Sequence, residues 1–295
     1  MNTNYINFLD RDLIKGLIPR RESNSHKDDF GRLLVIAGSY MYPGAAILSS
    51  RAAYRVGTGV VSIIADKYLE SIYASNFNEA TYFPLEKRGS ISEYEKFLDS
   101  NISRYSTILI GPGLGVDDNA FDLIYFLIKY LKDKSVNILI DADGLVNISK
   151  ISRWWEYLSD STVITPHIGE FKKLLGSDFD IGDSIKIVKE KSDEWGCSIV
   201  LKNSKTIIAK NSVDIFINNN ENSLLSTAGT GDILSGIIAG LIAQGVNTFD
   251  ASCVGVYIHS MVGMKLKERF SDRGMLSSDM LDEIPIVIKD LLKEH

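Results

Sequence analysis

The chain has 295 residues, of which 45% are hydrophobic and 24% are charged, and its net charge is −6. This length suits one large α/β domain or two smaller ones, with a core that needs no disulfide or metal. The acidic balance argues against a nucleic-acid partner, although the amides of a glycine-rich turn can still bind an anion locally.

Residues 1–30 are polar with mixed charges, and we expect them to form an N-terminal arm. Residues 1–12 lack the apolar core of a secretory signal. The apolar run at 233–243 contains glycines and is too short to span a membrane. Cys197 and Cys253 have no metal-ligand spacing and form no disulfide framework, so we expect buried thiols in the reducing environment of the cytoplasm.

From Gly31 onward, short apolar runs alternate with segments of helical periodicity. Continuous apolar strands separated by helices predict an α/β fold with a mostly parallel central sheet and helices on both faces. Strands are predicted at 33–37, 60–64, 107–110, 137–140, 162–164 and 198–201, with helices at 45–56 and 122–132.

The last third of the chain predicts a hairpin followed by helices. Its two strands, 205–209 and 213–217, lie on either side of a polar turn. Helices are predicted at 231–243, 248–268 and 278–293. Because no long polar linker, repeat or low-complexity tract interrupts the pattern, we expect a single domain over 1–295.

Glycines and polar residues follow most of the predicted strands directly. Ligands of open α/β sheets bind beyond the carboxyl ends of the strands, so these segments should line one edge and form a crevice for a large phosphate-bearing ligand. The segments are Gly38-Ser39-Tyr40-Met41-Tyr42-Pro43-Gly44-Ala45-Ala46, Gly111-Pro112-Gly113-Leu114-Gly115, Asp141-Ala142-Asp143-Gly144, Thr165-Pro166-His167-Ile168-Gly169-Glu170 and Lys202-Asn203-Ser204-Lys205-Thr206.

Each of these segments also has a purely structural interpretation. Residues 111–115 are compatible with a tight turn, and the two aspartates at 141 and 143 with helix caps. Thr165 suits an N-cap with Pro166 at the first helical position. His167 is compatible with a surface position, and Glu170 with a charge that favours the helix dipole.

Gly229-Thr230-Gly231-Asp232 opens the helix predicted at 231–243. Glycines let the backbone N–H groups converge, and the free N–H groups of a helix start bind anions. Asp232 lies within one turn of that anion position. Donors for a phosphoryl group beside a carboxylate base are what phosphoryl transfer to a hydroxyl requires. The alternative is an aspartate that only favours the helix dipole.

Several common catalytic patterns are missing from the sequence. None of the four histidines (His26, His167, His259 and His295) pairs with another at zinc spacing. The Walker pattern, the dinucleotide fingerprint and the serine-hydrolase elbow are also missing.

In order and spacing, these segments resemble the ADP/ATP-dependent NAD(P)H-hydrate dehydratases of the ribokinase-like superfamily, over about residues 19–285. The version Thr165-Pro166-His167-Ile168-Gly169-Glu170 separates this family from its vitamin-kinase relatives, which look more like Pro-Asn-x-x-Glu there. Two positions depart from the family pattern: Asn203 and Asp28 stand where glycine is usual. Since asparagine tolerates left-handed backbone, we expect the turn at Asn203 to be kept.

The resemblance implies repair of NADH or NADPH hydrated at C6 in the S configuration. ADP or ATP phosphorylates the hydroxyl, and phosphate is then eliminated. Asp232 would be the catalytic base, and Glu170 would order Mg²⁺ through water. The implied substrate contacts are Ala45, Gly113, His167 and Asp232. The implied nucleotide contacts are Lys202, Asn203, Ser204, Lys205, Thr206, Gly229, Thr230 and Gly231.

The resemblance further implies a homotetramer, and a dehydratase alone, without the epimerase domain that many relatives carry. Two other functions fit the same residues: a kinase of this fold acting on a vitamin precursor, and a catalytically silent nucleotide sensor. An intact Asp232 argues against the sensor.

Overall fold

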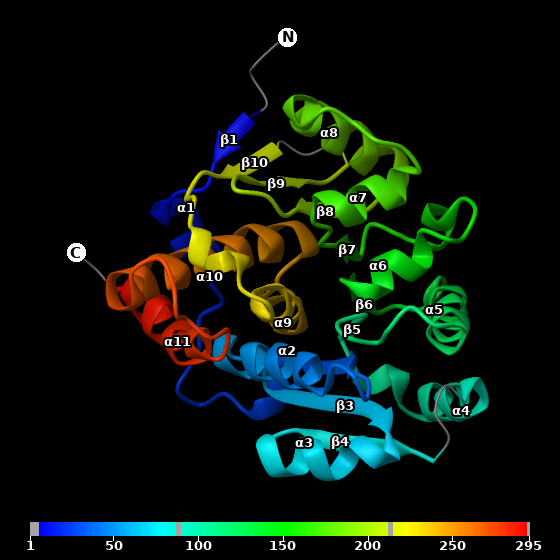
Figure 1. The fold of residues 1–295 in the computed structure, drawn as a ribbon. Helices are drawn as coiled ribbons and strands as arrows, with labels where there is room; N and C mark the ends of the chain where they lie inside the picture. Colours follow the sequence, from blue (N-terminus) through cyan, green and yellow to red (C-terminus); the bar gives the residue numbers. More distant parts are fainter. Residues whose placement is uncertain (1–5, 87–89, 212–214, 294–295) are drawn as a thin grey trace.

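A sheet of ten strands forms the centre of the computed structural model, which describes residues 6–86, 90–211 and 215–293 (Figure 1). Every neighbouring pair is parallel except that β9 is antiparallel to both β8 and β10. In sheet order the strands are β1 (Ile6–Phe8), β10 (Ile215–Asn218), β9 (Thr206–Ala209), β8 (Ser198–Leu201), β7 (Thr162–Ile164), β6 (Asn137–Ile140), β5 (Thr107–Ile110), β2 (Arg32–Ile36), β3 (Val60–Asp66) and β4 (Thr81–Leu85).

Helices cover both faces of the sheet, as predicted (Figure 1). Successive side chains of a strand point to opposite faces. In β2, Leu33 and Val35 join the core beneath one set of helices, whereas Leu34 and Ile36 join the core beneath the other. The first set is α1 (Arg11–Leu17), α2 (Pro43–Val56), α3 (Glu70–Asn76), α9 (Thr230–Ala243), α10 (Thr248–Phe270) and α11 (Asp279–Leu292), and the second is α4 (Ile91–Asn101), α5 (Asp118–Leu131), α6 (Asp143–Ile148), α7 (Ile168–Leu175) and α8 (Ser184–Trp195).

The N-terminal arm contains a strand and an α-helix that the sequence analysis did not assign, and a short 3-10 helix at Lys27–Phe30. Strand β1 pairs in parallel with β10, and helix α1 places the fully buried Ile14 in the core. Residues 1–5 of the arm lie outside the described residues. A three-residue edge strand is too short to produce a recognisable period, so its position became evident only from its pairing partner.

The other predictions of secondary structure hold to within a few residues. The hairpin of β9 and β10 is antiparallel, with Phe216 opposite Ile208, and part of its turn lies outside the described residues. Both cysteines are free and buried. No described helix has the length and apolar character needed to cross a lipid bilayer.

Helices α2 and α9 pack very closely, and this contact sets the geometry of the site. A Cβ on Gly236 would lie 2.1 Å from the backbone oxygen of Ser49, and a Cβ on Gly240 would lie 2.9 Å from the Cα of Ala53. The two contacts advance by one turn in each helix, so the chain runs in the same sense along both helices where they touch. One turn before Ser49 and Gly236 stand Ala45 and Asp232, near the N-termini of the two helices.

We expect Gly236→Ala to destabilise the protein by about 2–3 kcal/mol, because overpacking of a tight contact typically costs this much. The added methyl would have to push α9 away from α2, which thermal or urea unfolding would report. Gly16→Ala is the matched control, because nothing lies within 4 Å of the methyl that it adds to α1. Equal stabilities of the two variants would contradict the close packing.

Candidate active site

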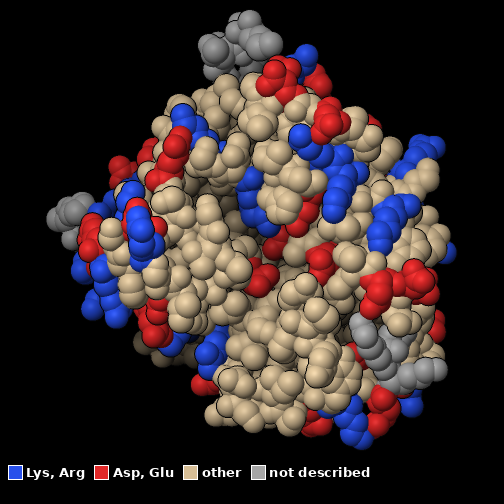
Figure 2. All heavy atoms as spheres, in the orientation of Figure 1, with Lys and Arg blue, Asp and Glu red and all other residues tan. Residues whose placement is uncertain are grey.

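The carboxyl ends of β6, β7 and β8 bring three predicted segments together. Asp141 follows β6, and Lys202 follows β8. The backbone N–H of Lys202 donates to the oxygen of Pro166 (2.8 Å), and Lys202 pairs with His167 in a parallel bridge. Figure 2 shows a central hollow on this face, in which acidic side chains gather beside a basic one.

Lys202 lies at the centre of a buried charge network. Its Nζ is 2.8 Å from Oδ1 of Asp141 and 4.0 Å from Oε2 of Glu170. The side chain of Asp141 is 1% exposed and that of Glu170 8%. Burial by itself lowers the pKa of Lys202, but the carboxylates of Asp141 and Glu170 outweigh it and leave the pKa raised. Lys202 therefore remains a cation.

Asp232 lies in the first turn of α9, where a helix start meets this network. Burial, assisted by the charge of Asp141 and opposed by Lys202, raises the pKa of Asp232 to about 7. A carboxyl with this pKa is well matched to proton transfer near neutral pH. Lys202 lies close by, because a Cβ on Gly231 would be 3.6 Å from its Nζ.

The backbone at the start of α9 is held from two sides. Gly229, the N-cap, has φ +89°, and a Cβ there would lie 2.6 Å from Oγ of Ser277. The hydroxyl of Thr230 donates to the backbone oxygens of Leu225 and Thr227, so its side chain is engaged within the protein. Nε2 of the buried His259 is 2.9 Å from the oxygen of Thr230. Burial lowers the pKa of His259 to about 4, so it is a neutral donor.

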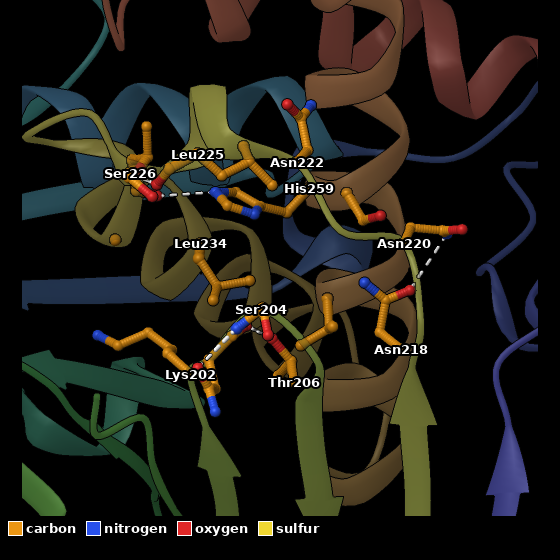
Figure 3. A pocket seen from close by; sticks show the side chains of 15 residues that line it. Lys202, Ser204, Thr206, Asn218, Asn220, Asn222, Leu225, Ser226, Leu234 and His259 are labelled. Atoms are coloured by element: carbon orange, nitrogen blue, oxygen red, sulfur yellow. Dashed lines mark hydrogen bonds between the residues drawn. The ribbon is translucent and has the colours of Figure 1, made fainter. Parts of the chain in front are cut away.

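A cavity of about 310 Å³ opens beside this helix start (Figure 3). It contains six of the predicted nucleotide contacts, namely Lys202, Asn203, Ser204, Thr206, Thr230 and Gly231. Lys205 and Gly229 are not part of its lining, and the ammonium of Lys205 lies 3.9 Å from the carboxylate of Glu221. Asn203 does not have a positive φ, so its turn forms without left-handed backbone.

The sequence analysis missed much of the cavity wall. In Figure 3 three asparagines lie on the side of the cavity away from Lys202, and Asn220 donates to Asn218 (3.2 Å). Helix α10 forms one wall of the cavity with Val256 and, three and four positions later on the same face of the helix, His259 and Ser260. The missed residues are Asn218, Asn220, Asn222, Leu225, Ser226, Leu234, Val256, His259 and Ser260. The asparagine-rich stretch 218–222 was the only signal in the sequence.

Two predicted substrate contacts, Ala45 and Gly113, touch one another. A Cβ on Gly113 would lie 2.8 Å from both the Cβ of Ala45 and the Cβ of Tyr42. Helix α2 also reaches the start of α9, because a Cβ on Gly229 would lie 2.8 Å from Cδ1 of Leu48. The loops after β2 and β5 therefore meet the start of α9 at one edge of the sheet.

His167, not Thr165, is the N-cap of α7, so the prediction of the cap was wrong. Nδ1 of His167 accepts from the N–H of Glu170 (3.2 Å), and Oε2 of Glu170 accepts from the N–H of His167 (2.8 Å). The helix begins later because residues 166 and 167 continue the strand and pair with Lys202. His167 remains 58% exposed and open to a ligand.

The two aspartates after β6 do not cap α6 either. The N-cap of this helix is Ala142, which makes no side-chain capping bond. Asp141 instead pairs with Lys202, and Oδ2 of Asp143 accepts from the N–H of Gly115 (2.8 Å).

Among the described residues, no group of three or more histidine, cysteine, aspartate or glutamate side chains is arranged to hold a metal. The carboxylates of Asp141 and Glu170 face the ammonium of Lys202. Burial raises the pKa of Glu170, against the effect of Lys202. Such a donor set fits a hydrated Mg²⁺ that takes its remaining ligands from water and phosphate, which is the usual arrangement for this ion.

Comparison with known proteins identifies relatives that align with nearly the whole chain. The chain is 32% identical over 284 residues to the ADP-dependent (S)-NAD(P)H-hydrate dehydratase of Nitrosopumilus maritimus, covering 94% of this chain and 95% of that protein. It is also 32% identical to the bifunctional NAD(P)H-hydrate repair enzyme of Moorella thermoacetica, but spans only 53% of that protein's length.

Solved structures show the same fold. A ribokinase-like superfamily protein from Enterococcus faecalis superposes with a TM-score of 0.84 at 26% identity, covering 99% of this chain and 98% of the other. The ADP/ATP-dependent NAD(P)H-hydrate dehydratase of Bacillus subtilis, co-crystallised with ATP and Mg²⁺, superposes with a TM-score of 0.79 at 25% identity, covering 96% and 98%. The family model described as NAD(P)H-hydrate dehydratase matches residues 33–286, and the chain therefore belongs to this family, with a ribokinase-like fold.

Proposed function

We propose that the chain dehydrates the S epimer of C6-hydrated NADH and NADPH at the expense of ADP or ATP. The observation that carries this proposal is the position of Asp232. Its carboxyl, with a pKa of about 7, stands in the first turn of α9, next in the chain to Thr230 and Gly231 of the cavity wall and within electrostatic reach of Asp141 and Lys202.

In the first step, Asp232 takes the proton of the C6 hydroxyl. The oxygen of that hydroxyl attacks the terminal phosphorus of the nucleotide. The bond between that phosphorus and the leaving AMP or ADP breaks. Backbone N–H groups of Gly229 and Gly231 and the ammonium of Lys202 hold the transferring phosphoryl group, whereas the N–H of Thr230 donates to the oxygen of Thr227 (3.3 Å). The C6–O bond then breaks with both electrons leaving on phosphate. A proton passes from C5 to water, and the C5–H electron pair restores the C5=C6 double bond.

Mg²⁺, when bound, neutralises the charge of the phosphates. Glu170 would hold it through water, with Asp141 beside it. Both carboxylates are buried and lie within 4.0 Å of the ammonium of Lys202, which lines the cavity. The two free cysteines support action in the cytoplasm, and we infer a homotetramer from the family resemblance alone.

A repair assay tests the proposed function. The chain is incubated with hydrated NADPH, Mg²⁺ and either ADP or ATP, and we expect the absorbance of the reduced cofactor to return with at least one nucleotide. Removing Mg²⁺ with a chelator should stop the recovery. An absence of recovery with both nucleotides, together with phosphorylation of a vitamin-like alcohol, would instead identify a small-molecule kinase.

A further inference from the structure

The turn between β6 and α6 has a backbone conformation that residues with a Cβ rarely adopt. Ala142 has φ +50° and ψ −123°. Such strain persists only where the surrounding structure imposes it, and it is often found at functional sites. The residues on either side, Asp141 and Asp143, send their carboxylates to different partners.

Asp143 and Asn147, which follows one turn later, both bond to the backbone of Gly115. Oδ2 of Asp143 accepts from the N–H of Gly115 (2.8 Å), and Nδ2 of Asn147 donates to the oxygen of Gly115 (2.9 Å). Asn147 is fully buried and also donates to the oxygen of Asp143 (2.8 Å). The loop 111–115 is thereby fixed at Gly115, two residues after Gly113, which lies against Ala45.

Asp141 holds the other half of the site. It pairs with Nζ of Lys202 at 2.8 Å, and its side chain is 1% exposed. Lys202 lines the cavity and lies beside Gly231 at the start of α9. The direction in which this ammonium points is therefore set by a carboxylate on the neighbouring turn.

We propose that the strained turn 141–143 is a positioning device that sets the two halves of the site relative to one another. Asp143, with Asn147, positions the loop 111–115 for the hydrated dinucleotide. Asp141 positions Lys202 for the phosphoryl group. This inference rests on the proposed function, which assigns the substrate to Gly113 and the nucleotide to Lys202.

Binding measurements separate the role of Asp143 and Asn147 from that of Asp141, and they do not require turnover. NADPH, the reaction product, is titrated by its fluorescence, and ADP by calorimetry. For Asp143→Ala we expect the Kd of NADPH to rise at least tenfold while that of ADP stays within twofold. Asp143→Asn keeps an oxygen acceptor for Gly115 and should restore the affinity for NADPH to within threefold of the original. Asn147→Ala gives a second test of the same role, and we expect it to show the pattern of Asp143→Ala.

The role of Asp141 is tested by measuring kcat. Asp141→Asn should lower kcat at least tenfold with both dissociation constants within threefold, because Lys202 is misdirected while both pockets persist. Ala142→Val, whose branched side chain resists positive φ, should weaken NADPH binding and lower kcat together. Ala142→Gly should keep both properties and raise the melting temperature.

The proposal is overturned if Asp143→Ala and Asn147→Ala leave NADPH affinity unchanged. It is also overturned if they weaken NADPH and ADP equally while the melting temperature falls, since that indicates a structural role. A chain that binds both probes but repairs no hydrate would contradict the proposed function and leave the positioning by Asp143 standing. A chain that binds neither probe would overturn both.

Discussion

Replacing Asp232 with asparagine is expected to lower kcat by about 10²–10⁴-fold, the usual contribution of a positioned general base. The amide has nearly the same shape but cannot accept the proton of the substrate hydroxyl. ADP affinity should stay within a few-fold, because the backbone donors of α9 remain. In the unmodified protein, the proposed activity should fall as the pH decreases through about 7, where Asp232 becomes protonated. Unchanged turnover in the variant would remove Asp232 as the base.

The same variant is expected to be more stable at neutral and higher pH. The pKa of Asp232 is raised from 3.8 to about 7 on folding, so the folded state binds this proton more tightly than the unfolded state. Folding stability is therefore lost as the pH rises from about 4 to 7, and asparagine avoids the loss. The gain should be on the order of 2–4 kcal/mol above pH 7, at about 1.4 kcal/mol per pKa unit, and should vanish near pH 4.

Asp250→Asn, in the first turn of α10, is the matched control for that gain. If Asp232 only favoured its helix dipole, both substitutions would cost a similar few tenths of a kcal/mol to about 1 kcal/mol. Urea unfolding across pH distinguishes the two cases, because only a buried base gives a stability increase that depends on pH.

Lys202→Met is expected to affect both activity and stability. Asp141 and Glu170 would lose their shared cation, and removing one partner of a buried ion pair typically costs about 3–5 kcal/mol. The loss should grow as the pH rises and Glu170, whose pKa burial raises, becomes ionised. Turnover should fall by at least about 100-fold, the scale for removing one electrostatic donor to a transition state.

The pH profile of this variant provides a second readout. Lys202 opposes the rise in the pKa of Asp232, so without it the acidic limb of any residual activity should move to higher pH. Lys202→Arg keeps the charge and should retain part of both stability and turnover. If Lys202→Met bound ADP, turned over and melted like the unmodified protein, the central role of this ammonium would be excluded.

The architecture of the sheet was predictable because its inner strands are buried on both faces. Runs such as Ile138-Leu139-Ile140 leave no polar alternation, and only a sheet covered by helices on both sides accommodates them. The edge strands β1 and β4 lack this signature. Strand β4 contains Pro84, which occurs in sheets almost only at an edge. They could not be found without knowledge of their neighbours.

In the site, segments at strand ends were predictable, whereas contacts between distant elements were not. Asp141 and Lys202 were both selected as strand-end residues, but their ion pair depends on the order β6-β7-β8 in the sheet. His259 lies 29 residues from Thr230 in a helix whose apolar face suggests only core. The cap of α7 moved because pairing with Lys202, a tertiary interaction, extends the strand past Thr165.

The reversal of direction at β9 has a consequence for engineering. Since β8 and β9 are antiparallel, residues 202–205 form the tip of a hairpin and not a crossover that must traverse a face of the sheet. Crossovers carry helices that are part of the core, whereas hairpin tips tolerate changes in length and composition. Lys202 must be kept, because it pairs with the buried Asp141 and its N–H donates to Pro166. Under the proposed function, donor preference can therefore be redesigned by exchanging residues 203–205 alone.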